Sequence, residues 1–226
     1  MHKTNLPRRA VIAGLAASAL AAPHAARAAG LGGLTGLLAQ ASDATLDKLA
    51  QPGAFFNDKA IRILLPLVGG GLGKSLGSVL EFGDKLGLTS HITRSLNDAA
   101  GLAAKEAKPV FRSAIDGLSL ADVPGIVSQN DGASRYLRQS AGQTLQTRLR
   151  PLIDTALGQV GAFNQLDALS RQSSLLGLAG LNHDRLGASV TEQAMNGIFK
   201  YLGDEETRLR ANPLGAAGNL LKGVFR

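Results

Sequence analysis

Apolar positions recur at helical spacing along most of the chain. The first such series is made up of Leu34, Leu37, Leu38, Ala41, Thr45 and Leu49. Intervals of three and four residues place side chains on one face of a helix. The series therefore predicts a helix over about residues 31–50, which ends at Gln51-Pro52-Gly53 because proline and glycine interrupt helices.

The pattern continues in the middle of the chain. It predicts helices over about 73–86, 90–107, 132–149 and 162–176, and another opened by Pro109. Pro151 is expected to kink or restart the helix that precedes it. Residues 54–58 are predicted to form a loop with two aromatic anchors. The apolar run 61–68 fits either a strand or a helix, and three glycines follow it at 69–71.

The last third carries the clearest helical face. Ser189 and Glu192 have capping-box spacing, and they are predicted to start a helix that runs to about Arg210. Its apolar face contains Val190, Ala194, Ile198, Tyr201 and Leu202. Residues 175–183 are predicted to be a loop, and 214–225 a final amphipathic turn or two. No repeat or linker divides the chain, so we expect an all-α, single compact multi-helix domain.

The N-terminus has the features of a removable leader. Residues 1–9 are basic, 10–22 are mildly apolar, and Pro23 follows. Thirteen apolar residues are too few to span a bilayer, which takes about 20. Ala26-Arg27-Ala28 fits the small-x-small cleavage rule. We therefore predict a signal peptide at 1–28, cleaved after Ala28, and a helical domain at 29–226 with no transmembrane segment.

Arg8-Arg9, followed by an apolar stretch, resembles a twin-arginine export signal. Pro7 stands where Ser or Thr is usual, so the general secretory route and a retained N-terminal anchor helix stay open as alternatives. Export by either the twin-arginine or the general secretory route predicts a periplasmic location.

Removing the leader changes the charge balance. The whole chain carries 24 basic and 17 acidic residues. Four of the basic residues and none of the acidic ones lie in 1–28, which leaves 20 against 17, a net charge of +3. Binding to nucleic acid requires clustered, unopposed cations. Here acids and bases are interleaved, so we expect no nucleic-acid partner.

Composition narrows the chemistry further. The chain has no cysteine, which removes disulfides and thiol chemistry and leaves core burial to stabilise the fold. Only His91 and His183 remain after the leader, so we expect no metal site and no cofactor. Gly73-Lys74-Ser75 resembles a phosphate-binding loop, but that motif requires glycine at 68, which is Val68. We interpret this segment as a hinge or a helix-packing element.

The sequence contains no clear catalytic set. His183, Asp184 and the serines at 173 and 174 could be assembled into a triad, but there is no Gly-x-Ser-x-Gly elbow. We interpret His183 as a solvated loop residue and Glu205 and Glu206 as part of a solvated, salt-bridged helix face, in which Glu206 and Arg210 are spaced for pairing. Whether the protein is an enzyme is therefore open, with no activity favoured.

Polar residues inside apolar helices are better candidates. Asn97 and Tyr136 both lie in apolar surroundings, and a buried amide or phenol must find hydrogen-bond partners. Each is predicted either to pin the fold or to line a pocket.

An ordered series of blocks resembles the bacterial DUF4197 family, a domain of unknown function, over nearly all of residues 35–226. The blocks are Pro52-Gly53-Ala54-Phe55-Phe56-Asn57, Leu96-Asn97-Asp98-Ala99-Ala100, Val110-Phe111-Arg112-Ser113-Ala114-Ile115, 121–137, 190–199, Glu205-Glu206, Arg210-Ala211-Asn212-Pro213 and 220–225. The resemblance implies an exported helical envelope protein, and it marks Asn97, Asp122 and Tyr136 as recurring polar positions and candidate ligand-binding residues. Gly101 and Gln129 depart from the family pattern, which has Glu and Gly at these positions.

Three functional hypotheses remain. The first is a non-enzymatic binding or interaction protein whose partner is an apolar small molecule or another envelope protein. The second is an uncharacterised enzyme, hydrolase-like, with Asn97, Asp122 or Tyr136 in its site. The third is a membrane-surface protein that uses residues 214–226.

Overall fold

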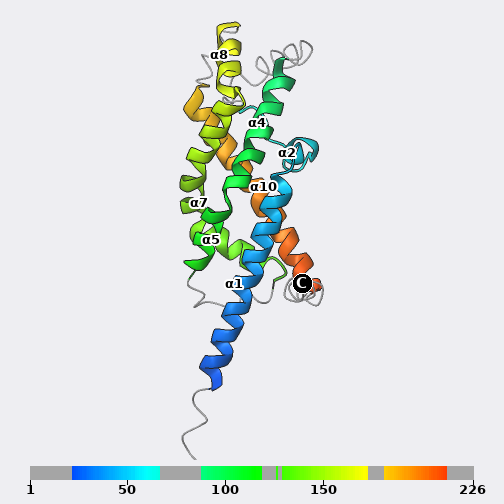
Figure 1. Ribbon diagram of the computed structural model, residues 1–226, viewed down its shortest axis with the longest axis vertical. Helices are drawn as coiled ribbons and strands as arrows, with labels where there is room; N and C mark the ends of the chain where they lie inside the picture. The colour runs from blue at the N-terminus through cyan, green and yellow to red at the C-terminus, as the bar shows by residue number, and fades with distance from the viewer. Residues whose placement is uncertain (1–21, 67–87, 119–125, 127–128, 173–180, 213–226) are drawn as a thin grey trace, which may run out of the picture.

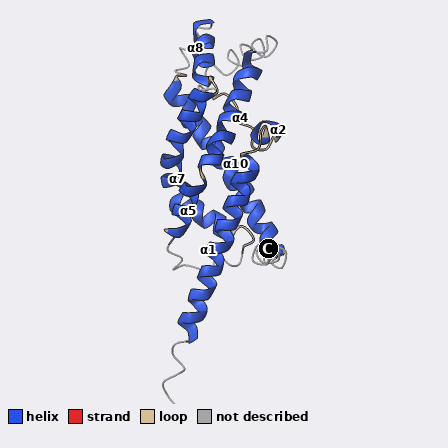
Figure 2. Cartoon of the chain, viewed as in Figure 1, coloured by secondary structure: helices blue, strands red, loops and turns tan. Residues whose placement is uncertain are grey.

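The described part of the chain is helical throughout its regular structure. The computed structural model describes residues 22–66, 88–118, 126, 129–172 and 181–212, with side chains from residue 33 on except those of 88, 89 and 172. Within these ranges there are seven helices and no strand (Figure 2). The helices are α1 (Ala22–Leu49), α2 (Ala54–Asn57), α4 (Leu88–Glu106), α5 (Lys108–Asp116), α7 (Gly132–Gln159), α8 (Ala162–Gln172) and α10 (His183–Ala211). The predicted all-α class is confirmed.

Three long helices give the molecule its elongated shape. Helices α1, α7 and α10 have 28, 28 and 29 residues, which corresponds to about 42 Å each at 1.5 Å per residue. Helix α10 runs antiparallel to both α7 and α1 and packs against each of them, while α4 contacts α1, α7 and α8 (Figure 1). The first turns of α1 extend beyond the other helices at the lower end of the view.

One apolar core runs along the bundle. Its largest fully buried side chains include Phe55, Phe111, Ile63 and Leu137. The rings of Phe111 on α5 and Phe199 on α10 lie with centroids 6.0 Å apart in a tilted arrangement. Burying an aromatic or leucine side chain of this kind stabilises the fold by roughly 1.5–3 kcal/mol, so core contacts alone account for a bundle without disulfides.

Helix α10 begins earlier than the sequence pattern suggested. Its N-cap is Asn182, whose side chain accepts a hydrogen bond from the backbone N–H of Arg185. The predicted start at Ser189 and Glu192 is wrong, because both residues lie inside the helix, where the Ser189 hydroxyl accepts a hydrogen bond from Gln193 instead. Residues 181–182 are the end of the predicted loop, whereas His183 is the first helical residue.

Helix α7 is longer than predicted because Pro151 does not end it. The helix continues from Gly132 to Gln159 with Pro151 inside. The proline ring faces solvent, while Leu149, Ile153 and Leu157 on the opposite side are buried in the core. Their burial offsets the missing backbone hydrogen bond. Pro109, as predicted, stands in the first turn of its helix, α5.

Two segments before α4 differ from expectation. The predicted loop at 54–58 contains the short helix α2, whose Phe55 is buried and whose Phe56 is half-buried. Residues 61–66, which we call the strap, are neither helix nor strand, and along them the buried side chains of 61, 63 and 65 alternate with half-buried or exposed ones at 62, 64 and 66. The predicted helix at 73–86, the glycines at 69–71 and residues 214–225 lie outside the described residues.

The leader prediction is not tested by the structure. In the full chain, α1 begins at Ala22 and continues through Ala28, so the predicted cleavage position lies within this helix. Among the described residues, no helix combines the length and the apolar character needed to cross a membrane.

Candidate functional site

A hollow opens beside the first turns of α7. It has a volume of about 490 Å³ and is lined by Ile126, Gln129, Gly132, Arg135, Tyr136, Gln139 and Ser140. Its lining combines polar and apolar surface. Tyr136, one of the predicted site residues, therefore lies in a pocket, although its role in ligand binding stays a prediction.

Gly132 makes the hollow sterically possible. It is the first residue of α7 and is buried. A Cβ built on Gly132 would overlap the backbone carbonyl of Ile126. The absent side chain lets the chain at Ile126 pass directly against the first turn of α7, so that Ile126 and α7 form two walls of one hollow.

The side chain of Glu206 caps the same end of α7. Its carboxylate accepts hydrogen bonds from the backbone N–H groups of Ala133 and Ser134, at 3.0 and 2.7 Å, and from the Ser134 hydroxyl at 2.5 Å. The first N–H groups of a helix have no partner within the helix, and a carboxylate there also interacts favourably with the helix dipole. Glu206 supplies the cap that the side chain of Asp131, the N-cap residue, does not.

The prediction that Glu206 faces solvent is wrong, because the residue is fully buried. Its predicted pairing with Arg210 is confirmed, with 2.6 Å between Arg210 Nη2 and Glu206 Oε1. The same guanidinium nitrogen donates to the carbonyl of Ile126 at 3.4 Å. Glu206 and Arg210 thus join α10 to both walls of the hollow. Glu205 does lie nearer the surface, where the Arg208 guanidinium lowers the pKa of its carboxyl group.

The hollow offers one cation and several hydrogen-bonding groups. Arg135 Nη1 donates to the side-chain oxygen of Gln129 at 2.6 Å. Because this acceptor is neutral, it leaves the positive charge of Arg135 uncompensated among the described residues. Gln139 and Ser140 add an amide and a hydroxyl, and Ile126 adds apolar surface. The lining suits a ligand that carries both an anionic group and an apolar part.

Asn97 does not line the hollow but holds the strap to the bundle. Its amide oxygen accepts from the N–H of Ile63 at 2.8 Å, and its amide nitrogen donates to the carbonyl of Ile63, also at 2.8 Å. The residue is 2% exposed. Of the two predicted roles, pinning the fold is therefore the one that its geometry shows. Asp122 lies outside the described residues.

Gln193 forms hydrogen bonds to both backbone groups of Leu64, as Asn97 does to those of Ile63. Its side chain accepts from the N–H of Leu64 and donates to its carbonyl, both at 2.9 Å. Two amide side chains, from α4 and α10, thus supply the hydrogen bonds that neighbouring strands would give an extended segment. Gln193 could not be identified from the sequence, because its pairing with Leu64 spans 129 residues and leaves no local pattern.

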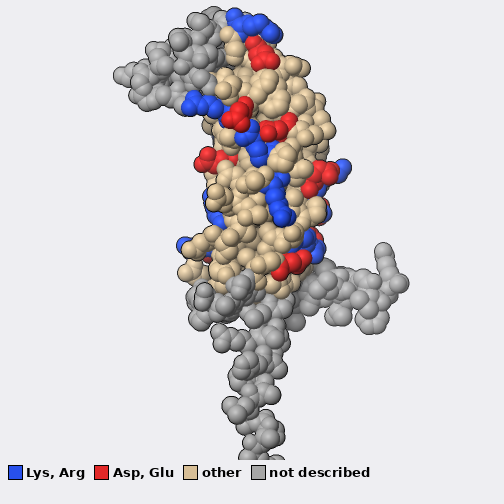
Figure 3. Space-filling view, turned by 90° about the vertical axis from the view of Figure 1, so that its left-hand side faces the viewer, with Lys and Arg blue, Asp and Glu red and all other residues tan. Residues whose placement is uncertain are grey.

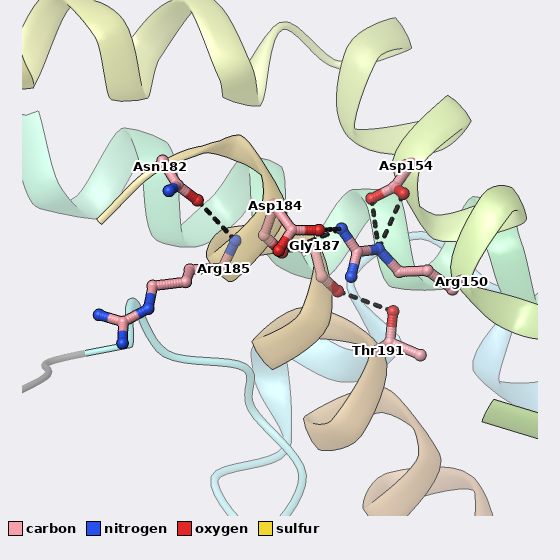
Figure 4. A network of polar contacts seen from close by, with 7 residues as sticks. All are labelled: Arg150, Asp154, Asn182, Asp184, Arg185, Gly187 and Thr191. Carbon is pink, nitrogen blue, oxygen red and sulfur yellow. Dashed lines mark hydrogen bonds and ion pairs between the residues drawn. The ribbon is translucent and has the colours of Figure 1, made fainter. Parts of the chain in front are cut away.

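A second polar network joins α7 to the start of α10. The Arg150 guanidinium contacts the carboxylates of Asp154 and Asp184 and the backbone carbonyl of Asp184 (Figure 4). A Cβ on Gly187 would overlap Asp154 and approach the Arg150 guanidinium to 2.9 Å. Gly187 therefore gives the ion-paired group room beside α10.

His183 is tied to α8 and does not form the triad considered from the sequence. Its ring nitrogen lies 2.8 Å from a carboxylate oxygen of Asp167, and its ring stacks on Phe163 with 4.5 Å between centroids. Asp184 interacts with Arg150 instead, and the serines at 173 and 174 lie outside the described residues. His183 is half-exposed, as expected, but it is helical and has partners.

Tyr201 and Asp58 form another short polar contact. The phenol donates to the Asp58 carboxylate at 2.6 Å. This hydrogen bond, together with burial, raises the pKa of Tyr201 to about 12. It also lowers the pKa of Asp58, with a smaller contribution from the backbone N–H of Ala60.

Charges of both signs are scattered over the side of the molecule formed by α7, among a larger area of uncharged residues (Figure 3). Several of the described charges are paired one helical turn apart, such as Lys200 with Asp204. Across the part of the chain that the structure describes, no three His, Asp or Glu side chains gather as metal ligands would.

The family model described as "Protein of unknown function (DUF4197)" matches residues 26–226. No curated protein and no solved structure matches the chain. The match covers every described residue from position 26 on, including Asn97, Tyr136 and the hollow. The chain therefore belongs to the DUF4197 family, a protein family of unknown function.

Proposed function

We propose that this protein is an exported, non-enzymatic binding protein of the bacterial envelope and that its ligand occupies the hollow beside Tyr136. The observation that carries the proposal is the hollow itself, about 490 Å³ in volume and lined by a cation that pairs with no described carboxylate, two amides, a serine hydroxyl and an apolar side chain. Ligand pockets of small-molecule binding proteins begin at about 300 Å³ and combine apolar walls with a few polar groups.

The ligand class follows from the lining. Arg135 favours an anionic group because a guanidinium binds carboxylates through two parallel hydrogen bonds. Ile126 and the ring of Tyr136 offer apolar surface to the rest of the molecule. An amphiphilic anion such as a fatty acid satisfies both parts, and this refines the apolar ligand expected from the sequence.

Two observations favour binding over catalysis. Asn97 is committed to the strap, and it does not line the hollow with Tyr136, as the hydrolase hypothesis requires. Glu206, the buried acid nearest the hollow, is held by five donors from Ala133, Ser134 and Arg210. A carboxylate with its lone pairs occupied in this way is suited to supporting the site rather than to transferring a proton.

The envelope location in this proposal rests on residues 1–28, whose basic start, apolar stretch and small-x-small end are typical of a leader. The membrane-surface alternative rests on residues 214–226, which lie outside the described part. A protein partner from the envelope remains the alternative to a small molecule.

The first test is native mass spectrometry of protein purified from the cells that produce it. The expected result is a bound mass of a few hundred daltons. Isothermal titration with decanoate then tests the site. Arg135→Gln is expected to weaken binding roughly tenfold, which is the value of a charge-assisted hydrogen bond.

Arg148→Gln is the matched control, because Arg148 lies on the same helix and contacts only Ser113 Oγ, outside the hollow. It is expected to leave decanoate binding unchanged. A protein that carries no bound mass and binds no decanoate, or an Arg135→Gln variant that binds as the native protein does, would overturn the small-molecule proposal. Crosslinking in cells would then test for a protein partner.

A further inference from the structure

Two guanidinium groups meet at one aromatic ring, away from the hollow. Phe56 belongs to α2, Arg62 to the strap and Arg94 to α4. The guanidinium carbons of Arg62 and Arg94 lie 4.9 and 4.5 Å from the centroid of the Phe56 ring. Three separate elements therefore bring two guanidinium groups to one aromatic ring.

These two charges have no anionic partner among the described residues. Arg62 Nε donates to the backbone carbonyl of Phe56 at 2.6 Å, and Arg94 makes only the ring contact. By contrast, Arg112, Arg150, Arg208 and Arg210 each bind a carboxylate.

The carboxylates closest to this cluster in the sequence do not neutralise it. Asp58 is engaged by the Tyr201 hydroxyl and the N–H of Ala60. Asp98 stands one helical turn after Arg94, yet it forms no ion pair with it. Neither of these two carboxylates therefore pairs with the cluster.

The energetics of the cluster favour such an anion. A ring face attracts each guanidinium only modestly at exposed sites, and the two like charges repel each other. An anion that contacts both guanidinium groups adds two attractions that offset this repulsion. Guanidinium groups match phosphate oxygens in geometry and bind them through paired hydrogen bonds.

We propose that Arg62 and Arg94, positioned by the ring of Phe56, form a binding site for a phosphate group. The phosphate belongs either to a small free molecule or to a lipid headgroup. Side chains alternate along the strap, so Leu64 lies on the same outer side as Arg62, and it is 58% exposed. If the phosphate belongs to a lipid headgroup, we expect Leu64 to contact the apolar part of the same lipid.

The test measures binding of inorganic phosphate to the protein purified from its own cells, by isothermal titration at constant ionic strength with chloride as the reference anion. Arg94→Gln, at an exposed site with no hydrogen bond to lose, is expected to weaken phosphate binding about tenfold. Phe56→Leu keeps an apolar side chain but removes the ring, and it is expected to weaken binding as well.

Arg171→Gln is the matched control, because Arg171 lies on α8 and its side chain makes no hydrogen bond or ion pair among the described residues. It is expected to bind phosphate as the native protein does. A second arm uses phosphatidylcholine vesicles with and without phosphatidic acid. Phosphate binding in solution identifies a free ligand. Binding to phosphatidic acid vesicles alone, lost in both Arg94→Gln and Leu64→Ser, identifies a lipid headgroup.

Three results would overturn the site. The first is no response to phosphate or to either kind of vesicle. The second is a response that chloride reproduces at the same ionic strength. The third is equal binding by the native protein and Arg94→Gln, with the fold of the variant verified by circular dichroism.

Discussion

The carboxylate of Glu206 accepts both the backbone N–H and the hydroxyl of Ser134, a residue 72 positions earlier in the chain. This relationship makes the start of α7 depend on the last turns of α10. Glu206→Ala leaves the N–H groups of Ala133 and Ser134 and the Arg210 guanidinium without their acceptor. The expected loss is about 2–4 kcal/mol of unfolding free energy, measured by urea denaturation.

Glu205→Ala is the control for Glu206→Ala, because it removes a carboxylate at the neighbouring position. Glu205 pairs with Arg208 near the surface, and exposed pairs contribute about 0–1 kcal/mol. If the two variants lost equal stability, the capping role of Glu206 would be wrong.

Asn97→Ala and Gln193→Ala are expected to act on different amides of the strap. Removing Asn97 exposes the N–H of Ile63 to exchange, and removing Gln193 exposes that of Leu64. Hydrogen exchange followed by NMR checks this residue by residue. The expected loss of stability is about 1–3 kcal/mol for Asn97, whose partners are buried, and less for Gln193. Unaltered protection of Ile63 in the Asn97 variant would contradict the assignment.

Gly187→Ala tests the packing at the Arg150 network. The new methyl group would overlap Asp154, so the ion pairs with Arg150 must shift. We expect a net loss of about 1–3 kcal/mol, despite the higher helix propensity of alanine.

Gly158→Ala is the control for this prediction, since no neighbouring atom lies within 4 Å of its added Cβ. This helical position is expected to gain up to about 1 kcal/mol. Thermal unfolding of both variants shows whether steric overlap or propensity decides the outcome.

The raised pKa of Tyr201 predicts that the protein loses stability at alkaline pH. Its pKa is raised to about 12 in the folded state, from an ordinary value of 10. The folded protein therefore retains a proton that the unfolded chain releases, and the contribution to stability is complete below pH 10 and lost as the pH rises toward 12. Tyr201→Phe is expected to flatten this part of the pH–stability curve.

The two tyrosines can be separated spectroscopically. In Tyr136→Phe, the phenolate absorbance reports Tyr201 alone, with an expected midpoint near pH 12. At acid pH the sign is reversed: the pKa of Asp58 is lowered, mainly by Tyr201, so its contribution is present above its ordinary pKa and lost as the pH falls. A midpoint near 10 for Tyr201 would mean that the hydrogen bond to Asp58 does not persist in solution.

The export route is tested with Arg8→Lys combined with Arg9→Lys. If the leader is of the twin-arginine type, the variant is expected to accumulate uncut in the cytoplasm, while the native protein loses residues 1–28 as measured by intact mass. Arg27→Lys, which also keeps the charge but lies outside the pair, is expected to be exported normally. Normal export of the double variant would assign the protein to the general secretory route.

Local patterns predicted most of the helices, and long-range contacts account for what they missed. The end of α1 and the extent of α4 agree with the apolar spacing within two residues. The pair Glu206–Arg210 was also visible locally, at i and i+4. The burial of Glu206 was not, because it depends on the start of α7 lying against α10.

For the candidate site residues too, local patterns indicated some features, whereas long-range contacts determined others. Apolar surroundings correctly indicated that Asn97 needs buried partners, but no signal in the sequence pointed to Ile63 as the partner. Cation–π contacts of Arg62 and Arg94 likewise join segments 32 residues apart, so the phosphate site could be found only in three dimensions.

The paired amides at the strap also set an order of events in folding. Synthesis releases Ile63 well before Asn97, and Leu64 must wait for Gln193, 129 residues later. Contacts that close long stretches of chain form slowly, because the entropy of closure is spent before the contact is made. The contacts of the strap with both Asn97 and Gln193 can therefore form only after Gln193 has been synthesised. A chain truncated before Gln193 would leave the N–H and the carbonyl of Leu64 without these two hydrogen bonds.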